Sequence, residues 1–205
     1  MKQATGRTNL PTAPNKVSIQ LALDGHSFSI VGSRAALSEA VVSVEILTPR
    51  TLLVPEELFD PSHAGTLLAA DGKAPHTGEE IVHSAPVEGI VALMTVPTKA
   101  LRRLRERLDT DAELAYTTPL LAPAHPDKPT VLLHQAAGYL YIRIYNGGLR
   151  LAEALPMPTD ADIRYVLERL ETEFPLKQYA AQLFGKENRR LEKLVGKRFK
   201  SVRCE

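Results

Sequence analysis

Hydrophobic and polar positions alternate in three places along the first 50 residues, and this alternation predicts three consecutive β-strands. The three segments span residues 17–23, 26–32 and 40–47. Asp24-Gly25 separates the first two segments, and this dipeptide favours the tight turn of a β-hairpin. The sequence therefore predicts that the chain begins with a three-strand antiparallel meander.

The middle of the chain combines short helical patterns with apolar runs. Pro55-Glu56-Glu57 predicts a helix start, with proline at the first helical position and two acids at the positive end of the helix dipole. Residues 80–85 and 89–97 predict a pair of strands. Residues 97–109 predict a helix, because their leucines recur at the helical spacing of three and four positions.

Three prolines within ten residues, at positions 123, 126 and 129, interrupt the pattern, which then restarts. The second half predicts strand, strand, strand, helix, strand, helix and strand. Thr159 and Asp162 predict a capping box at the start of its first helix, with Asp in place of the usual Glu. The predicted segments are residues 130–134, 139–145, 149–154, 158–174, 179–184, 186–199 and 200–205.

The two halves begin with the same predicted order of strands, which indicates an approximate structural duplication. The predicted organisation is a loose tail at residues 1–16, a first unit at 17–122, a proline-rich linker at 123–129 and a second unit at 130–205. Antiparallel strands followed by alternating helices and strands define an α/β layer arrangement.

Composition narrows the range of protein classes. The chain is 44% hydrophobic with a formal net charge of +1, so we expect a folded core and no overall preference for acidic or basic partners. The single cysteine, Cys204, excludes a disulfide framework within the chain. The N-terminus has no apolar signal-peptide core and no segment reaches the length of a membrane helix, so we expect a cytoplasmic protein without a transmembrane segment.

The order of elements is similar to that of a ribonuclease H-like unit, and two such units in tandem resemble the actin-like ATPase superfold. The segment "TLLVPEELF" at residues 51–59, with "ALDGHSFSI" at 22–30, resembles a family of uncharacterised bacterial proteins, found mainly in Bacteroidetes, that has this duplicated fold. The resemblance covers residues 17–205, and "LVPEELF" is its most specific part. Distant relatives of that family include actin-like proteins of cell division and of type IV pilus assembly.

The resemblance implies a nucleotide site between the halves. Actin-like ATPases hold phosphates with small-residue turns on two hairpins, keep an Asp nearby for magnesium, and hold adenosine with a later Gly-rich turn. Backbone N–H groups in such turns donate hydrogen bonds to the phosphate oxygens, while the Asp carboxylate binds the magnesium ion. The matching cofactor-binding positions are Asp24, Gly25, Gln135, Gly138 and Gly185.

Each of the three turns departs from the pattern that the resemblance implies. "DGHS" compresses the usual Asp-x-Gly-Ser/Thr order, and Gly185-Lys186 replaces a Gly-Gly pair. His134 occupies the second Asp position, and an imidazole supplies no carboxylate to hydrated magnesium. Alanines at positions 136 and 137 limit backbone approach to a phosphate. We therefore expect a degenerate nucleotide site, no catalytic or metal-binding residues and no cofactor, with ATP and magnesium as the alternative.

Other features leave alternatives open. Asp24 is also favoured by the hairpin turn alone, and His134 also suits the end of a strand. Residues 186–203 carry eight basic and two acidic side chains, a net of 8 − 2 = +6, and residues 99–107 add five basic side chains and one acid. One interpretation is that the basic side chains of these predicted helices simply face solvent. If both helices lie on one side of the molecule, they instead form a surface for an acidic partner or nucleic acid. Tyrosines 139, 141 and 145 alternate on one strand face. This face either contacts another copy or a ligand, or it packs beneath a helix or within a cross-strand aromatic ladder.

The leading prediction is a non-catalytic binding or assembly protein on a degenerate actin-like fold, acting through a protein partner or a homo-oligomer. The first alternative is a nucleotide-binding protein or slow ATPase, and the second is nucleic-acid binding through the basic helices. An open polar cleft in which Asp24, Gln135 and Gly138 converge would favour a nucleotide. A packed contact between the halves would favour the leading prediction.

Overall fold

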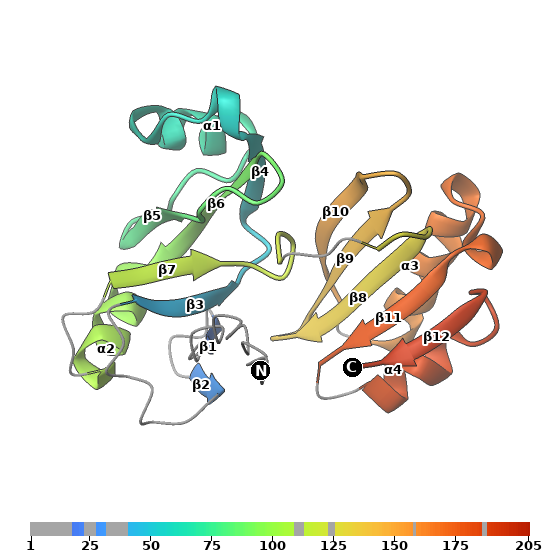
Figure 1. Ribbon diagram of the computed structural model, residues 1–205. Helices are drawn as coiled ribbons and strands as arrows, with labels where there is room; N and C mark the ends of the chain where they lie inside the picture. Colours follow the sequence, from blue (N-terminus) through green and yellow to red (C-terminus); the bar gives the residue numbers. More distant parts are fainter. Residues whose placement is uncertain are drawn as a thin grey trace, which may run out of the picture.

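The computed structural model describes residues 18–22, 28–31, 41–108, 113–122, 126–157, 159–185 and 188–205. The predicted tail, the Asp24-Gly25 turn and the first part of the linker lie outside these residues. The described chain forms two halves, each a mixed arrangement of strands and helices (Figure 1).

The second half has the predicted order of elements. Its sheet runs β10-β9-β8-β11-β12, in which β8, β9 and β10 are antiparallel neighbours while β11 and β12 run parallel to β8. The three-strand meander predicted for this half is therefore confirmed. The elements are β8 (Thr130–Ala136), β9 (Tyr139–Tyr145), β10 (Leu149–Pro156), α3 (Asp160–Glu173), a 3-10 turn (Leu176–Gln178), β11 (Ala180–Phe184), α4 (Asn188–Val195) and β12 (Ser201–Cys204).

Helices α3 and α4 cover one face of this sheet (Figure 1). The α3 helix starts at the predicted capping box: the Thr159 hydroxyl accepts from the Asp162 N–H at 3.3 Å, and the Asp162 carboxylate accepts from the Thr159 N–H at 2.9 Å. This reciprocal cap satisfies two backbone donors that a helix start otherwise leaves without partners. The apolar faces of both helices pack on alternate residues of β8 and β9, namely Val131, Leu133, Leu140, Ile142 and Ile144.

The strand order in the first half differs from the predicted three-strand meander. Strands β1 (Ser18–Ala22) and β2 (Phe28–Val31) form the expected antiparallel pair, but β3 (Val41–Leu47) runs parallel to β1 on the side away from β2. The order of this sheet is β2-β1-β3-β7, with β7 (Glu113–Thr117) parallel to β3. The three-strand antiparallel meander predicted for this half is therefore wrong. Hydrophobic alternation identifies strands, but it does not specify which strands become neighbours.

A second, three-stranded sheet completes the first half. Its order is β4-β6-β5, all antiparallel, formed by β4 (Thr51–Pro55), β5 (Glu79–His83) and β6 (Ile90–Pro97). A bridge between Ser84 and Tyr116 links the end of β5 to β7 of the other sheet. Sequence patterns predicted the β5–β6 pair but missed β4 and β7.

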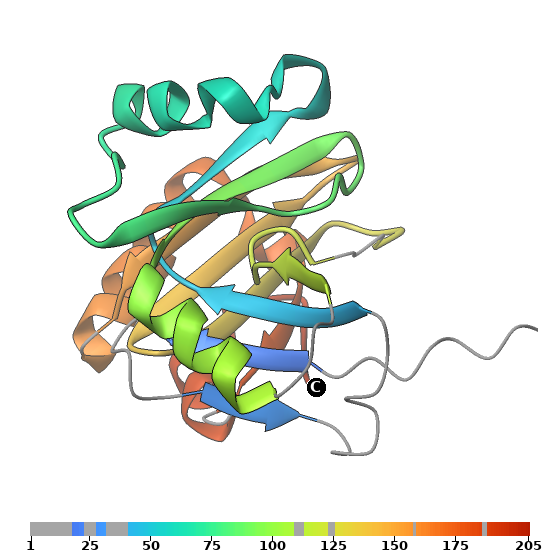
Figure 2. The same ribbon diagram turned by 90° about the vertical axis from the view of Figure 1, so that its left-hand side faces the viewer.

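Strand β6 is buried on both faces, which explains its continuous apolar run. Val91 and Leu93 pack beneath α1 (Ala64–Ala70), whereas Met94 and Val96 pack beneath α2 (Thr98–Leu108). The two helices lie on different sides of the first half (Figure 2). The leucines that predicted α2 are buried in the expected way.

The predicted helix at Pro55 is only a 3-10 turn. Pro55 ends β4 and precedes a turn at Glu56–Leu58, followed by a second at Pro61–His63. The proline does start a helical segment, but it stands before the first turn rather than within it. No large apolar stripe follows Pro55, so no packing drives a longer helix here.

Candidate functional site at the junction of the halves

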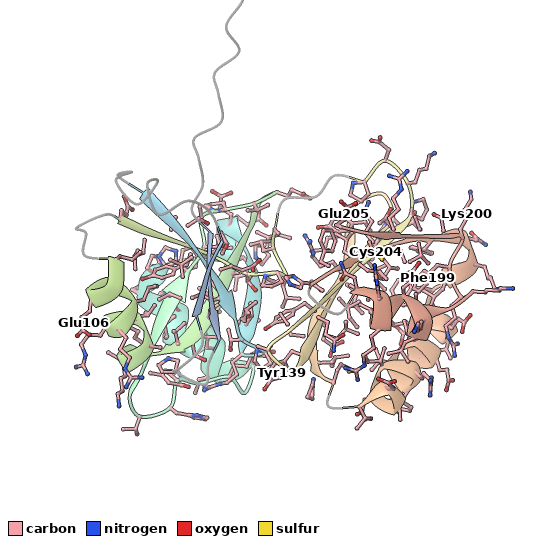
Figure 3. The ribbon with its side chains drawn as sticks, turned by 90° about the horizontal axis from the view of Figure 1, so that it is seen from below. Glu106, Tyr139, Phe199, Lys200, Cys204 and Glu205 are labelled. Carbon is pink, nitrogen blue, oxygen red and sulfur yellow. The ribbon has the colours of Figure 1, made fainter. Side chains whose placement is uncertain are left out.

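The face of the second sheet opposite α3 and α4 packs against the first half. Tyr141 is buried together with Leu47 of β3 and Leu120, and Tyr139 and Leu53 pack against this cluster. Tyr139 lies between the two halves when the molecule is seen from below (Figure 3). The residues of β8 and β9 therefore have an apolar environment on both faces of the sheet, which accounts for the continuous hydrophobicity of these strands.

The turn between β8 and β9 is the predicted second phosphate turn. Its two central residues, Ala137 and Gly138, have φ angles of 51° and 77°, and positive φ at both positions is typical of a type I′ hairpin turn. A Cβ atom added to Gly138 would meet no atom within 4 Å, so this glycine serves the turn conformation rather than a close contact. Its carbonyl already accepts a hydrogen bond from the Met157 N–H at 3.0 Å.

Gly185, the predicted adenosine-turn glycine, packs directly on the predicted phosphate turn. A Cβ atom added to Gly185 would lie 2.4 Å from the Gln135 carbonyl oxygen and 3.4 Å from its carbonyl carbon. This contact follows from the parallel pairing of β8 with β11, in which Phe184 lies opposite His134. The two backbone segments are therefore in direct contact at this position.

His134 lies at the end of β8 among aromatic rings. Its ring centroid is 6.1 Å from that of Tyr141 and 6.3 Å from that of Phe184. Burial lowers the pKa of His134, against the opposing effect of Glu45, and Arg143 lowers it further. The imidazole is therefore predominantly neutral at pH 7, and it offers a magnesium ion neither a carboxylate nor a negative charge.

Glu45 and Arg143 bring opposite charges to this junction from the two halves. Glu45 of β3 is close enough to influence the pKa values of His134, Tyr141 and Arg143. The Arg143 guanidinium donates to the Ala122 carbonyl oxygen and lies 6.0 Å from the centroid of the Tyr145 ring. Burial is the main cause that raises the pKa of Tyr141, so its phenol stays protonated. The Arg143 hydrogen bond to Ala122 links the two halves.

Four buried side-chain oxygens have no hydrogen-bond partner among the described residues, and three of them lie near the candidate site. They are Gln135 Oε1 at the turn, Asn188 Oδ1 at the start of α4 and Tyr141 OH at the junction. Asn188 is anchored through its amide nitrogen, which donates to the Glu205 carbonyl at 2.8 Å. An unpaired buried acceptor is energetically costly, so these oxygens are the observation that most favours a bound polar group.

The structure brings together only part of the predicted site. Gln135 and Gly185 are in contact, and Gly138 lies at the far end of the same turn. Asp24 and Gly25 lie outside the described residues. Sequence reasoning missed Arg143, although an arginine within an otherwise apolar strand is a signal that its charge has a specific partner.

The tyrosine-rich face of β9 also corrects a prediction. Tyr141 and Tyr145 are buried, so this face is not free for self-association. It does not pack beneath a helix either, because the helices cover the opposite face of the sheet. Tyr139 and Tyr141 form part of the contact between the halves.

The two basic helices lie in different halves, at opposite ends of the molecule (Figures 1 and 3). Two of the basic side chains near α4 form ion pairs with α3 or its first turn: Arg190 with Asp160 at 2.5 Å, and Arg198 with Glu171 at 2.6 Å. The arrangement does not place the two basic helices on one shared surface.

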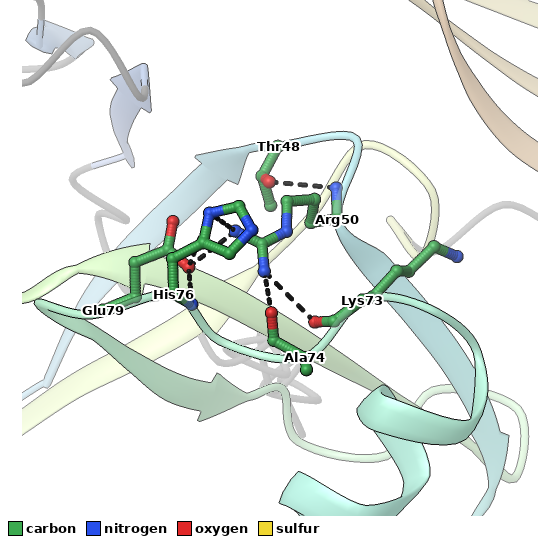
Figure 4. A network of polar contacts seen from close by, with 6 residues as sticks. All are labelled: Thr48, Arg50, Lys73, Ala74, His76 and Glu79. Atoms are coloured by element: carbon green, nitrogen blue, oxygen red, sulfur yellow. Dashed lines mark hydrogen bonds and ion pairs between the residues drawn. The ribbon is translucent and has the colours of Figure 1, made fainter.

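A separate polar cluster in the first half centres on Arg50 (Figure 4). Its guanidinium donates to Glu79 at 2.6 Å, to the Lys73 carbonyl at 3.3 Å and to the Ala74 carbonyl. The Lys73 ammonium group donates a hydrogen bond to the Thr51 carbonyl at 2.9 Å. The cluster fastens the loop after α1 to the chain that enters β4, which is a structural role.

Among the residues that the structure describes, no three His, Cys, Asp or Glu side chains come together in a way that could hold a metal ion. Among the helices that the structure describes, none has the length and apolar character needed to cross a membrane.

These features define an α/β protein with an actin-like ATPase fold. The chain is similar to a solved protein of Bacteroides thetaiotaomicron with an actin-like ATPase fold and unknown function, at a TM-score of 0.70 and 18% identity, covering 98% of this chain and 94% of that one. This likeness concerns the fold alone.

Two further structures are similar over smaller shares of the chain. The cytoplasmic domain of Epsl, an inner-membrane component of the type II secretion system of Vibrio cholerae, has a TM-score of 0.45 at 11% identity and covers 83% of each chain. An Aquifex aeolicus member of the Ppx/GppA family has a TM-score of 0.26 at 16% identity, covering 42% of this chain and 37% of that one. No family model and no curated protein matches the sequence.

Proposed function

We propose that this protein is a non-catalytic binding or assembly protein that acts through protein–protein contacts. One observation carries the proposal: the Gly185 backbone packs directly on the Gln135 backbone, so the residues expected for the phosphate and adenosine turns are in contact with each other. A glycine retained for backbone-to-backbone contact is a packing feature. The fold then acts as a scaffold that presents its outer surfaces.

The chemistry of the junction supports the same proposal. Phosphoryl transfer needs a metal ion that bridges the phosphates and a group that orients the attacking water. The imidazole of His134 supplies neither a carboxylate nor a negative charge, and burial lowers its pKa so that the ring is neutral. The buried cluster around Leu47, Leu120 and Tyr141 makes this part of the junction apolar.

A nucleotide-binding protein or slow ATPase is the second candidate, favoured by the unpartnered oxygens of Gln135 and Asn188. Both are acceptors, and they suit the donor groups of a sugar or base better than a phosphate. Nucleic-acid binding through the basic helices has weaker support, because the helices lie in different halves and Arg190 and Arg198 have acidic partners.

An ATP hydrolysis assay separates the proposal from its main competitor. We expect purified protein with ATP and magnesium to release phosphate no faster than buffer, and the Asp24→Asn variant to behave identically. Turnover that requires magnesium and disappears in Asp24→Asn would show that the protein is an ATPase and would overturn the proposal.

A further inference from the structure

The dipeptide Asn146-Gly147 stands at the tip of the hairpin that joins β9 to β10. Asn146, Gly147 and Gly148 are all exposed to solvent. Asparagine is a chemically labile residue, and a following glycine, which has no Cβ, leaves its own backbone nitrogen sterically open to the asparagine side chain. The tip of this hairpin therefore combines a reactive dipeptide with access for water.

The hydrogen bonds of the turn leave the nitrogen of Gly147 available. The Asn146 N–H donates to the Gly148 carbonyl at 2.9 Å, and the Asn146 carbonyl accepts from the Arg150 Nε at 2.8 Å. Among the residues that the structure describes, no hydrogen bond engages the Gly147 N–H. The backbone nitrogen that lies next to the Asn146 side chain in the sequence is therefore not committed to a partner.

We propose that Asn146 is a site of spontaneous deamidation. The Gly147 backbone nitrogen loses its proton to solvent and attacks the Asn146 Cγ atom. A bond forms between these two atoms, the bond from Cγ to Nδ2 breaks, and Nδ2 takes up a proton and leaves as ammonia. Water then opens the resulting succinimide ring at either carbonyl, which gives aspartate or isoaspartate. The reaction consumes one water, releases one ammonia and needs no oxidant or reductant.

Arg150 gives the new carboxylate a favourable environment. Its guanidinium already contacts the turn, through the Asn146 carbonyl at 2.8 Å and at 4.0 Å from the position that a Cβ atom on Gly147 would occupy. Arginine forms charge-assisted hydrogen bonds with carboxylates. Asn146 and Arg150 are both exposed, so water also solvates the added charge. The turn therefore accommodates the aspartate product.

The modification changes one contact with the core of the second half. Asn146 Nδ2 donates to the Tyr179 hydroxyl at 3.3 Å, and Tyr179 is 3% exposed, with its ring edge-on to Phe174 at 6.3 Å. A carboxylate cannot donate this bond, but it can accept one from the Tyr179 hydroxyl. Isoaspartate instead inserts the side-chain methylene into the backbone, which disturbs the tight turn between β9 and β10. Aspartate should therefore preserve the hairpin, whereas isoaspartate should loosen it.

The test is mass spectrometry of tryptic peptides after weeks of incubation of the folded full chain. Peptide 144–150 contains one asparagine, and we expect it to gain about 1 Da as the amide becomes a carboxyl group. The gain should be faster at mildly alkaline than at mildly acidic pH, because the attacking nitrogen must lose its proton. Asn188, which precedes Arg189 rather than a glycine, is the internal control and should keep its mass.

Two variants sharpen the readout. Gly147→Ala should slow the gain in mass at least ~tenfold, because a Cβ atom hinders the attack. Asn146→Asp supplies the reference for the aspartate peptide, so that isoaspartate is recognised as a second peak of equal mass. This variant should also melt within a degree or two of the wild-type chain, since Arg150 and Tyr179 both accept a carboxylate at the turn.

The incubation of the wild-type chain decides the inference without any variant. An unchanged peptide 144–150, a gain that does not depend on pH, or an equal gain at Asn188 would overturn it. A Gly147→Ala variant that is modified as fast as the wild-type chain would overturn it as well. None of these results bears on ATP turnover, so the proposed non-catalytic function stands or fails separately, in the hydrolysis assay.

Discussion

Two glycines in the candidate site differ in what the molecule requires of them. Gly138 has a φ of 77° and open space around its Cα, whereas Gly185 has a φ of 112° and lies against the Gln135 backbone. The first needs only conformational freedom, while the second also needs the absence of a side chain. Alanine substitutions at the two glycines should therefore differ in their effect on stability.

We expect Gly185→Ala to lower the free energy of unfolding by about 3 kcal/mol, through both strained φ and a collision with backbone atoms. Gly138→Ala should cost only about 1 to 2 kcal/mol, because its strain is conformational alone. Urea denaturation of both variants measures the difference. Equal losses for the two variants would contradict the packed contact between Gly185 and Gln135.

His134 supplies a second prediction at this scale. Burial lowers its pKa in the folded protein below the ordinary value of 6.5, although Glu45 partly opposes this and Arg143 reinforces it. The unfolded chain therefore binds this proton more readily, so stability is full above pH 6.5 and decreases as the pH falls below it. Tyr141 and Phe184 also contact the ring but carry no charge in this range.

The expected result is that the wild-type chain loses more stability between pH 7 and pH 5 than the His134→Gln variant does. Denaturation midpoints at four or five pH values across this interval measure the difference in slope. The other histidines are present in both proteins, so their contributions cancel in the comparison. Parallel pH profiles would mean that His134 is solvated, and that this part of the junction is not packed as described.

At the scale of elements, the Arg50 cluster holds one loop in place. The Arg50 guanidinium and the Glu79 carboxylate, with 20% and 14% of their side chains exposed, form a pair that water screens only partly. The same guanidinium satisfies two carbonyls of the loop. Removing it leaves the two carbonyls without this donor, while among the described residues the Glu79 carboxylate keeps only the His76 N–H, at 2.7 Å.

We expect Arg50→Ala to lower the free energy of unfolding by about 2 to 3 kcal/mol and to speed hydrogen exchange in residues 71–79. Arg50→Lys should not restore the wild-type value, because an ammonium group cannot reproduce the fork of donors. Arg102→Ala is the matched control, since Arg102 forms an exposed ion pair with Glu106 and should cost at most ~0.5 kcal/mol. A loss for Arg50→Ala no larger than that of the control would contradict this role.

The elements also show what sequence patterns could and could not predict. The second half followed its pattern, because a capping box, an Asn-Gly turn and leucine spacing are local signals. The pairing of β3 with β1 was not predictable in this way, since it depends on a crossover between strands. The contact of Gly185 with Gln135 was equally hidden, because it joins residues that are 50 positions apart. Arg143 was visible in the sequence, but its role became clear only from its burial and its hydrogen bond to Ala122.

At the scale of the whole molecule, two halves share one buried junction. Leu47 and Leu120 from the first half meet Tyr141 from the second, and Arg143 donates across to Ala122. Packing of this kind favours a fixed relation between the halves. The proposed function therefore depends on the outer surfaces of the molecule.

The measurement that tests this account most directly is thermal unfolding with and without ATP and magnesium. A ligand present at 100 times its dissociation constant would stabilise the folded state by about 2.7 kcal/mol, enough to raise the melting temperature by several degrees. We predict no shift at millimolar nucleotide, with or without the metal. A shift that depends on magnesium and is lost in Asp24→Asn would contradict the account and establish a working nucleotide site.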